Sequence, residues 1–208
     1  MPTRNNTTLY FIRHGETPSN AHHVHQGIKI DDYLDTEGIL QTHRLIPLIP
    51  WLNLDVIFTS YLHRAEETAA ILKQSLKNPI DVFHDYRLRE RDFGSLVGMS
   101  NEDWLKLVPN YRELEQFQKY NYRPFGGENV DDVRQRTLTA ILDITENHYG
   151  QNIGVVTHDG IIRLMLFHFP DIPRIYRDHE AGKQVANADI YEWEITDGQL
   201  QNIRSLLK

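Results

Sequence analysis

Three short apolar runs, each rich in β-branched or aromatic side chains, constrain the fold more than any other feature of the sequence. They span residues 8–12 (Thr-Leu-Tyr-Phe-Ile), 55–59 (Asp-Val-Ile-Phe-Thr) and 153–157 (Ile-Gly-Val-Val-Thr). Their interiors do not alternate with polar residues, which is typical of strands buried on both faces of a parallel sheet. The sequence therefore favours an α/β fold.

Patterns typical of helices lie between these runs. Apolar residues recur at helical spacing in residues 37–45, 65–76 and 130–148. Residues 161–167 form an apolar segment, which should be a buried helix that ends before Pro170. Two weaker strand signals remain, at residues 80–84 after a turn, and at residues 189–195, which alternate like a late strand at a sheet edge. This order predicts a three-layer α/β/α fold with a mostly parallel central sheet and helices on both faces.

The composition is that of an ordinary soluble globular protein. The chain has 208 residues, of which 40% are apolar and 25% are charged. No linker rich in Gly, Ser or Pro divides it, so residues 1–208 are predicted to form a single domain. An aromatic-rich insertion at about residues 99–125, with a helix expected early in residues 111–122, could form a lid or simply add to the core. Its aromatic residues are Trp104, Tyr111, Phe117, Tyr120, Tyr122 and Phe125.

The charge and cysteine counts exclude several classes of protein. With 22 basic and 29 acidic residues the formal net charge is −7, which argues against binding nucleic acid or an anionic membrane. The chain contains no cysteine, so disulfides, thiol nucleophiles and thiolate metal sites are excluded. No apolar segment approaches the roughly 20 residues that a bilayer requires, and the N-terminus lacks the apolar stretch of a signal peptide. We therefore expect a cytoplasmic protein.

Polar residues directly follow the predicted strands. They are Arg13 and His14 after the first run, Arg64 shortly after the second, His158 after the third and Glu90 after the weaker candidate. Because ligands bind at the carboxyl ends of strands in an open parallel sheet, these residues are predicted to meet in one crevice. Two arginines and two histidines there suit an anion, and phosphate best, because guanidinium forks match its oxygens. A histidine among such donors can attack phosphorus through a ring nitrogen.

Six segments occur in an order and at a spacing that match one family. They are Phe11-Ile12-Arg13-His14-Gly15-Glu16-Thr17 with Asn20, Gln26-Gly27 with Asp35-Thr36-Glu37-Gly38, Thr59-Ser60-Tyr61-Leu62-His63-Arg64-Ala65 with Thr68-Ala69, Leu88-Arg89-Glu90-Arg91-Asp92-Phe93-Gly94, Gly126-Gly127-Glu128, and Val155-Val156-Thr157-His158-Asp159-Gly160. These segments resemble the motifs of the histidine phosphatase superfamily, which includes the cofactor-dependent phosphoglycerate mutases. The resemblance covers residues 8 to about 195 and implies a phosphoglycerate mutase-like fold.

The resemblance also implies roles for individual residues. His14 would be the nucleophile that forms a phosphohistidine, and Glu90 would protonate the leaving oxygen and then activate water. Arg13, Arg64 and His158 would hold the phosphoryl oxygens. The other predicted substrate-binding residues are Thr17, Asn20, Gln26, Gly27 and Asp159. No metal and no cofactor are required. Other carboxylates, Glu16 above all, are available as alternatives to Glu90.

The sequence favours hydrolysis over isomerisation of a phosphoglycerate. Mutases of the family carry a Tyr in the acid motif, a Lys shortly after it and an adjacent pair of arginines in the following insertion. Here Phe93 and Asn101 stand at the first two positions and no adjacent arginine pair follows, although Arg91 matches. The prediction is a metal-independent phosphomonoesterase acting on a small phosphorylated metabolite, and the alternative within the family is a phosphoglycerate mutase.

Two interpretations remain that assign the chain to a different functional class. A catalytically silent phospholigand-binding module is disfavoured because nucleophile and acid are both present. A metallohydrolase would use His22, His23 and His25, but these lack helical spacing and are better explained as a hydrated loop beside the pocket. Neither the physiological substrate nor the oligomeric state is predicted.

Overall fold

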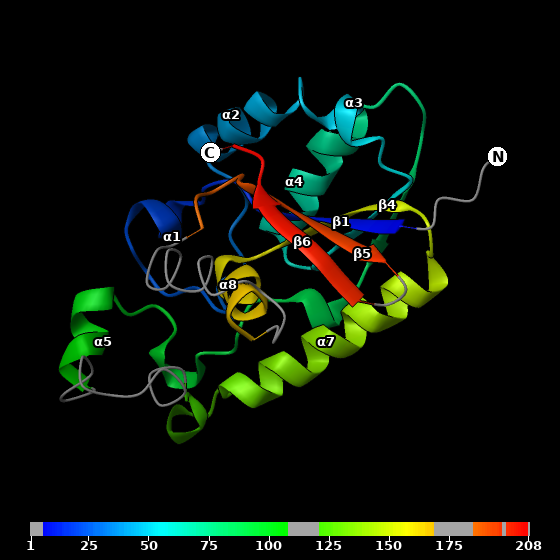
Figure 1. The fold of residues 1–208 in the computed structure, drawn as a ribbon. Helices are drawn as coiled ribbons and strands as arrows, with labels where there is room; N and C mark the ends of the chain where they lie inside the picture. Colours follow the sequence, from blue (N-terminus) through cyan, green and yellow to red (C-terminus); the bar gives the residue numbers. More distant parts are fainter. Residues whose placement is uncertain (1–5, 108–120, 169–184, 197–198, 208) are drawn as a thin grey trace.

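One mixed sheet forms the centre of the molecule (Figure 1). A computed structural model of the chain describes residues 6–107, 121–168, 185–196 and 199–207. In these ranges the sheet has the strand order β3-β2-β4-β1-β5-β6, in which β1 to β4 run parallel and β5 and β6 are antiparallel to their neighbours. The strands are β1 (Asn6–Arg13), β2 (Val56–Thr59), β3 (Asp81–His84), β4 (Asn152–Thr157), β5 (Ile190–Thr196) and β6 (Gln199–Ser205).

Helices cover both faces of the sheet and complete the predicted α/β architecture (Figure 1). One apolar core lies between the sheet and α2, α3 and α4, and a second lies between the sheet and α7 and α8. The helices are α1 (Pro18–Ala21), α2 (Thr36–Leu45), α3 (Ile49–Leu52), α4 (His63–Gln74), α5 (Asn101–Leu107), α7 (Val130–Asn147) and α8 (Asp159–His168). Short 3-10 turns add η1 (Tyr86–Leu88), η2 (Gly94–Leu96) and η4 (Arg123–Phe125). Within the described ranges, every helix is too short or too polar to cross a bilayer.

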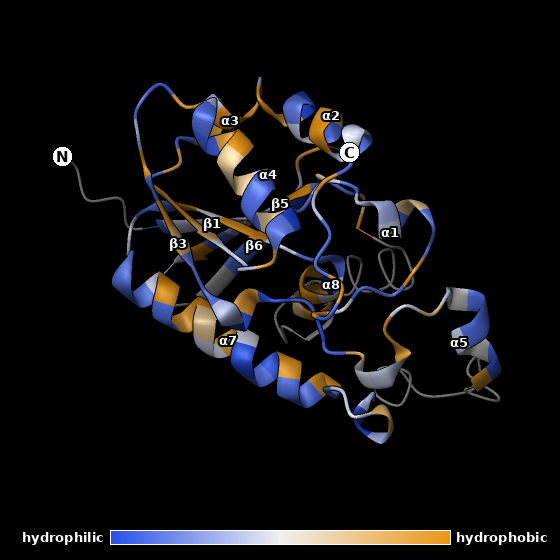
Figure 2. Ribbon diagram, turned by 180° about the vertical axis from the view of Figure 1, so that it is seen from behind, coloured by the Kyte–Doolittle hydropathy of each residue, from blue (hydrophilic) through white to orange (hydrophobic). Residues whose placement is uncertain are grey.

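The long helix α7 shows how local sequence sets these elements. Its start is fixed by a capping box, in which the Asn129 side chain accepts a hydrogen bond from the Asp132 amide and the Asp132 carboxylate accepts one from the Asn129 amide. Hydrophilic and hydrophobic segments alternate along the helix in Figure 2, and Val133, Ala140 and Ile144 are buried. An amphipathic helix of this kind packs one side on the sheet and leaves the other in water.

The structure corrects the prediction for the end of the sheet. The late strand is present as β5, but it lies between β1 and β6 and is not an edge. The edge strand is β6, which the sequence analysis missed because its residues are mostly polar. Ile203 on β6 is buried and Arg204 on the same strand pairs with Glu192 of β5. The helix expected early in residues 111–122 falls almost entirely in residues 108–120, outside the described residues.

The order of the strands brings the predicted site together. β2, β4 and β1 are neighbours and parallel, so their carboxyl ends lie at the same edge of the sheet. The pairing continues past the strands, because the His14 amide donates to the Thr157 carbonyl and the Ser60 amide donates to the Val156 carbonyl. The turn after β1 also lies against the start of α2, where a methyl group on Gly38 would overlap the main chain of Glu16.

Candidate active site

His14 and His158 lie face to edge at the carboxyl edge of the sheet, with ring centroids 5.1 Å apart. Both are almost completely buried. His14 Nδ1 is 2.6 Å from the Gly15 carbonyl oxygen. A carbonyl can only accept a hydrogen bond, so Nδ1 carries the proton and Nε2 keeps a free electron pair. His158 Nε2 is 2.9 Å from the Ser60 hydroxyl, and its Nδ1 is buried without a hydrogen-bond partner among the described residues.

Two buried arginines flank these histidines. Arg13 donates through Nη1 to the Val185 carbonyl, and Arg64 donates through Nη2 to the Gly27 carbonyl at 2.8 Å and through Nη1 to the Ile30 carbonyl at 3.2 Å. In both arginines, Nε is buried and has no hydrogen-bond partner in the described part of the chain. A buried cationic donor without an acceptor is costly. This pair of donors therefore fits a site that an anion completes.

Glu90 lies between the site and the start of α8. Its carboxylate accepts hydrogen bonds from the Arg91 amide at 2.8 Å and from the Gly160 amide at 3.3 Å. A Cβ atom on Gly160 would overlap this carboxylate, so any larger residue there would displace the Glu90 side chain from its present position. The negative charge of Glu90 acts on both Arg13 and Arg64, which places it beside the cationic group.

The loop after β1 carries Thr17, Asn20, Gln26 and Gly27, which were predicted to bind substrate, and the structure shows their contacts within the protein. The Thr17 hydroxyl accepts from Gln26 Nε2 at 2.7 Å, and the Gln26 Oε1 atom is buried without a partner among the described residues. The Asn20 side-chain oxygen accepts from Asn187 at 3.2 Å. Gly27 has φ +55° and presents its carbonyl to Arg64. All four residues thus lie in the loop after β1, whose carbonyls at Gly27 and Ile30 hold Arg64.

Asp159 holds another segment against the site. Its carboxylate accepts from the Val185 amide at 2.8 Å, and Val185 in turn accepts from Arg13. The Arg163 guanidinium lies 3.6 Å from the other carboxylate oxygen. Asp159 was predicted to bind substrate, and in the structure it orients the segment that positions Arg13.

Burial keeps both site histidines neutral. It lowers the pKa of His14 well below 6.5, and the positive charges of Arg64 and Arg13 lower it further. Burial, together with the charge of Arg64, likewise lowers the pKa of His158 well below 6.5. A neutral His14 with a free electron pair on Nε2 is in the protonation state that a nucleophile needs.

These shifts predict how stability depends on pH. In the unfolded chain both histidines bind protons below about pH 6.5, whereas in the folded protein they stay neutral. The unfolded state therefore binds more protons as the pH falls. We expect the free energy of unfolding to decrease between pH 7 and 5.5, with each histidine contributing a slope that approaches about 1.4 kcal/mol per pH unit.

Urea unfolding at a series of pH values measures this slope. His14→Ala should reduce it, whereas His43→Asn, at an exposed position on α2, should leave it unchanged. Equal slopes for the wild type and His14→Ala would contradict the prediction.

The three histidines of the cluster make separate contacts or face solvent. His22 Nδ1 lies 2.7 Å from the Pro18 carbonyl, His23 is exposed, and the His25 ring packs against the rings of Phe93 and Trp104. Across the described ranges, no three His, Asp or Glu side chains lie close enough together to hold a metal ion. The loop therefore gives no support to the metallohydrolase interpretation.

The aromatic residues of the insertion that the structure describes form a small core. Trp104 and Tyr122 are buried with Phe93 and Leu96, and Phe125 packs against them. This agrees with the interpretation of these side chains as core. Tyr111, Phe117 and Tyr120 lie outside the described residues.

Several residues that hold the site were not predicted from the sequence. Ser60 directly follows β2, and the same strand-end rule that singled out His158 could have identified it. Asn187, which donates to the His14 carbonyl at 3.2 Å, belongs to no motif and gave no signal. Arg136 donates to the main-chain carbonyls of Arg87, Arg89 and Glu90. It gave no signal either, because in sequence it is one of several charged residues on a long helix.

The parallel strands, the helices on both faces and the cationic group at the carboxyl edge define a phosphoglycerate mutase-like α/β protein with buried arginines and histidines at that edge. The sequence profile of the histidine phosphatase superfamily (branch 1) matches residues 9–205. The chain belongs to this superfamily.

Individual relatives agree with this membership. The chain is 34% identical to "Phosphoglycerate mutase-like protein 4" of Arabidopsis thaliana over 157 residues, 74% of this chain and 67% of the relative. It is 30% identical to "Metal-independent phosphoserine phosphatase" of the same plant over 186 residues, 88% of this chain and 74% of the relative. The solved structure of Bacillus stearothermophilus YhfR superimposes with a TM-score of 0.81 at 29% identity, covering 94% of each chain. The superfamily's phosphatases are thus among the proteins that this chain resembles.

Proposed function

We propose that the protein is a metal-independent phosphomonoesterase that hydrolyses a small phosphorylated metabolite through a phosphohistidine on His14. One observation carries the proposal: the buried Nε atoms of Arg13 and Arg64 have no acceptor among the described residues, and they flank a neutral histidine whose Nε2 atom keeps its electron pair. A phosphoryl group would supply the missing acceptors and would offset the buried positive charge. It would also present phosphorus to the nitrogen that can attack it.

The reaction would proceed in two steps, phosphorylation of His14 and hydrolysis of the phosphohistidine. His14 Nε2 attacks phosphorus, the bond from phosphorus to the leaving oxygen breaks, and that oxygen takes a proton from Glu90. The Gly15 carbonyl stabilises the positive charge on the phosphorylated ring through Nδ1. Glu90 then takes a proton from water, the water oxygen attacks phosphorus and the nitrogen–phosphorus bond breaks. The products are an alcohol and phosphate, and Glu90 ends protonated as it began.

The remaining site groups would stabilise the transferred phosphoryl group. Arg13 and Arg64 would donate to its oxygens, which carry the negative charge in the transition state. His158 would add a donor through Nδ1 if the Ser60 hydroxyl donates to its Nε2 atom. The His158–Ser60 contact therefore supports a donor role for His158.

Hydrolysis is favoured over phosphoglycerate isomerisation by the groups around Arg91. Its guanidinium lies over the rings of Phe93 and Tyr122, each 5.7 Å from the ring centroid. In the sequence, Phe93 stands where the mutases carry a Tyr hydroxyl, Asn101 stands where they carry a Lys, and no adjacent pair of arginines follows. A mutase must hold a phosphoglycerate long enough to return the phosphoryl group to it. A chain without the Tyr, the Lys and the arginine pair has fewer polar groups with which to hold the phosphoglycerate.

A phosphatase panel run with a metal chelator tests the proposal. It would compare sugar phosphates, phosphoserine, phosphoglycerates, nucleotides and aryl phosphates. We expect hydrolysis of at least one small phosphomonoester at a rate that the chelator does not change. Isomerisation of 3-phosphoglycerate faster than its hydrolysis, in the presence of bisphosphoglycerate, would instead identify a mutase. Phosphate binding without any turnover would identify a silent binding module.

A further inference from the structure

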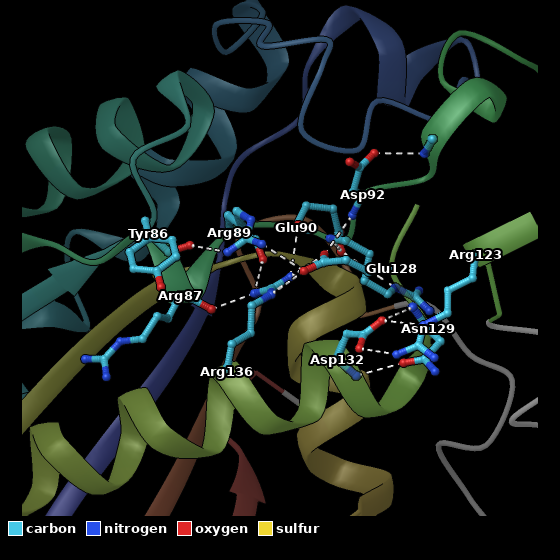
Figure 3. A network of polar contacts seen from close by, with 12 residues as sticks. Tyr86, Arg87, Arg89, Glu90, Asp92, Arg123, Glu128, Asn129, Asp132 and Arg136 are labelled. Carbon is cyan, nitrogen blue, oxygen red and sulfur yellow. Dashed lines mark hydrogen bonds and ion pairs between the residues drawn. The ribbon is translucent and has the colours of Figure 1, made fainter. Parts of the chain in front are cut away.

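Arg136 on α7 holds a network of polar contacts behind the proposed site (Figure 3). Its side chain is only 10% exposed and points toward the segment that carries Glu90. Three of its hydrogen bonds go to main-chain carbonyls of that segment, at Arg87 (2.6 Å), Arg89 (2.9 Å) and Glu90 (3.2 Å). The other two go to the Glu128 carboxylate, at 2.9 Å and 3.0 Å. All five N–H groups of the guanidinium are used, so none is left for a ligand.

Glu128 is saturated in the same way. Beyond its two bonds from Arg136, it accepts from the Arg89 guanidinium at 2.8 Å and from the Asp92 amide at 3.0 Å. Its own amide donates to the Asp92 carbonyl at 2.9 Å. These contacts hold the pKa of the Glu128 carboxyl below its usual value, against the opposing effect of burial. Arg136 and Glu128 together therefore hold the main chain on both sides of Glu90, at Arg87 and Arg89 before it and at Asp92 after it.

The main chain of Glu90 is held by Arg136, while its carboxylate is held by the amides of Arg91 and Gly160. The direction of the carboxylate depends on the carbonyl next to it, because few rotatable bonds separate the two groups. Misplacing a catalytic group by about 1 Å can cost about 100-fold in rate. The Arg136 contacts are therefore positioned to control how well Glu90 meets the leaving oxygen.

We propose that Arg136 is a positioning residue that aims Glu90 at the leaving-group oxygen. The proposal rests on the proposed function, in which Glu90 is the proton donor. Arg136 acts through the main chain of residues 87–90 and touches neither the phosphoryl group nor the leaving group. Its loss should therefore slow only those substrates whose leaving oxygen needs a proton.

The test compares alkyl phosphates with 4-nitrophenyl phosphate, whose leaving group departs without a proton. Arg136→Gln should lower kcat/KM for an alkyl phosphate by about 10- to 100-fold and for 4-nitrophenyl phosphate by less than about threefold. Arg136→Lys keeps the charge beside Glu128 but cannot reproduce the planar five-donor geometry, so it should restore part of the loss. If Arg136→Gln does not fold, the comparison of the two substrates is made with Arg136→Lys, which should lose more activity on the alkyl phosphate than on 4-nitrophenyl phosphate. Arg134→Gln, at an exposed position two residues earlier on α7, is the matched control and should change neither rate.

A double variant separates positioning from general destabilisation. If Arg136 acts through Glu90, Glu90→Gln combined with Arg136→Gln should be no slower on the alkyl phosphate than Glu90→Gln alone. A further loss in the double variant, or an equal loss for both kinds of substrate in the single variant, would overturn the inference. If Glu90→Gln itself fails to discriminate between the two substrates, the proposed acid is wrong, which is a separate and distinguishable result.

Discussion

His14→Ala is expected to lose all detectable phosphatase activity, a fall in kcat/KM of more than about 10⁴-fold. The variant lacks the Nε2 atom, which keeps a free electron pair beside the buried donors of Arg13 and Arg64. Water would have to attack the bound ester directly, without a covalent intermediate. Turnover of the best substrate from the phosphatase panel, measured with and without chelator, gives the size of the loss.

The covalent step has its own measurement. Wild-type enzyme mixed with ³²P-labelled substrate and quenched in alkaline denaturant should carry label on the peptide that contains His14, and His14→Ala should carry none. Alkaline quenching is needed because acid hydrolyses the nitrogen–phosphorus bond. His43→Ala, at an exposed position on α2, is the control for loss of a histidine as such. Substantial turnover by His14→Ala with a native circular dichroism spectrum would rule out the phosphohistidine mechanism.

The strand ends made most of the cationic group predictable. Arg13 is the last residue of β1, and His14 and His158 directly follow β1 and β4, whose apolar character is evident in the sequence; parallel pairing brings such positions to one edge. Arg64 is the second residue of α4, and the same rule places it nearby. These predictions needed only the order of the strands and the chemistry of the residues after them.

The supporting residues could not be predicted in this way. Arg136 lies 46 residues from Glu90 along the chain, and Glu128 lies 36 residues from Asp92. Their contacts depend on how α7 packs against the segment after β3, which periodicity does not reveal. β6 was missed for a related reason. An edge strand needs to bury only one face, so a mostly polar sequence suffices once β5 provides a partner.

Glu90→Gln is expected to divide substrates by their leaving groups. For alkyl phosphates kcat/KM should fall by about 10²- to 10⁴-fold, the usual contribution of general acid catalysis. For 4-nitrophenyl phosphate the first step should be nearly unaffected, because nitrophenolate leaves without a proton. The second step should still be slow, since glutamine cannot take a proton from the attacking water.

This combination predicts a burst for Glu90→Gln with 4-nitrophenyl phosphate. About one equivalent of nitrophenol per site should appear quickly, followed by slow turnover, and labelled phosphohistidine should accumulate to a higher level than in the wild type. Glu37→Gln, at an exposed position on α2, should behave as the wild type. Glu16→Gln tests the closest alternative in the sequence. If Glu16→Gln discriminates between leaving groups and Glu90→Gln slows both substrates equally, the proton donor is Glu16, and the contacts of Glu90 with the Arg91 and Gly160 amides are structural.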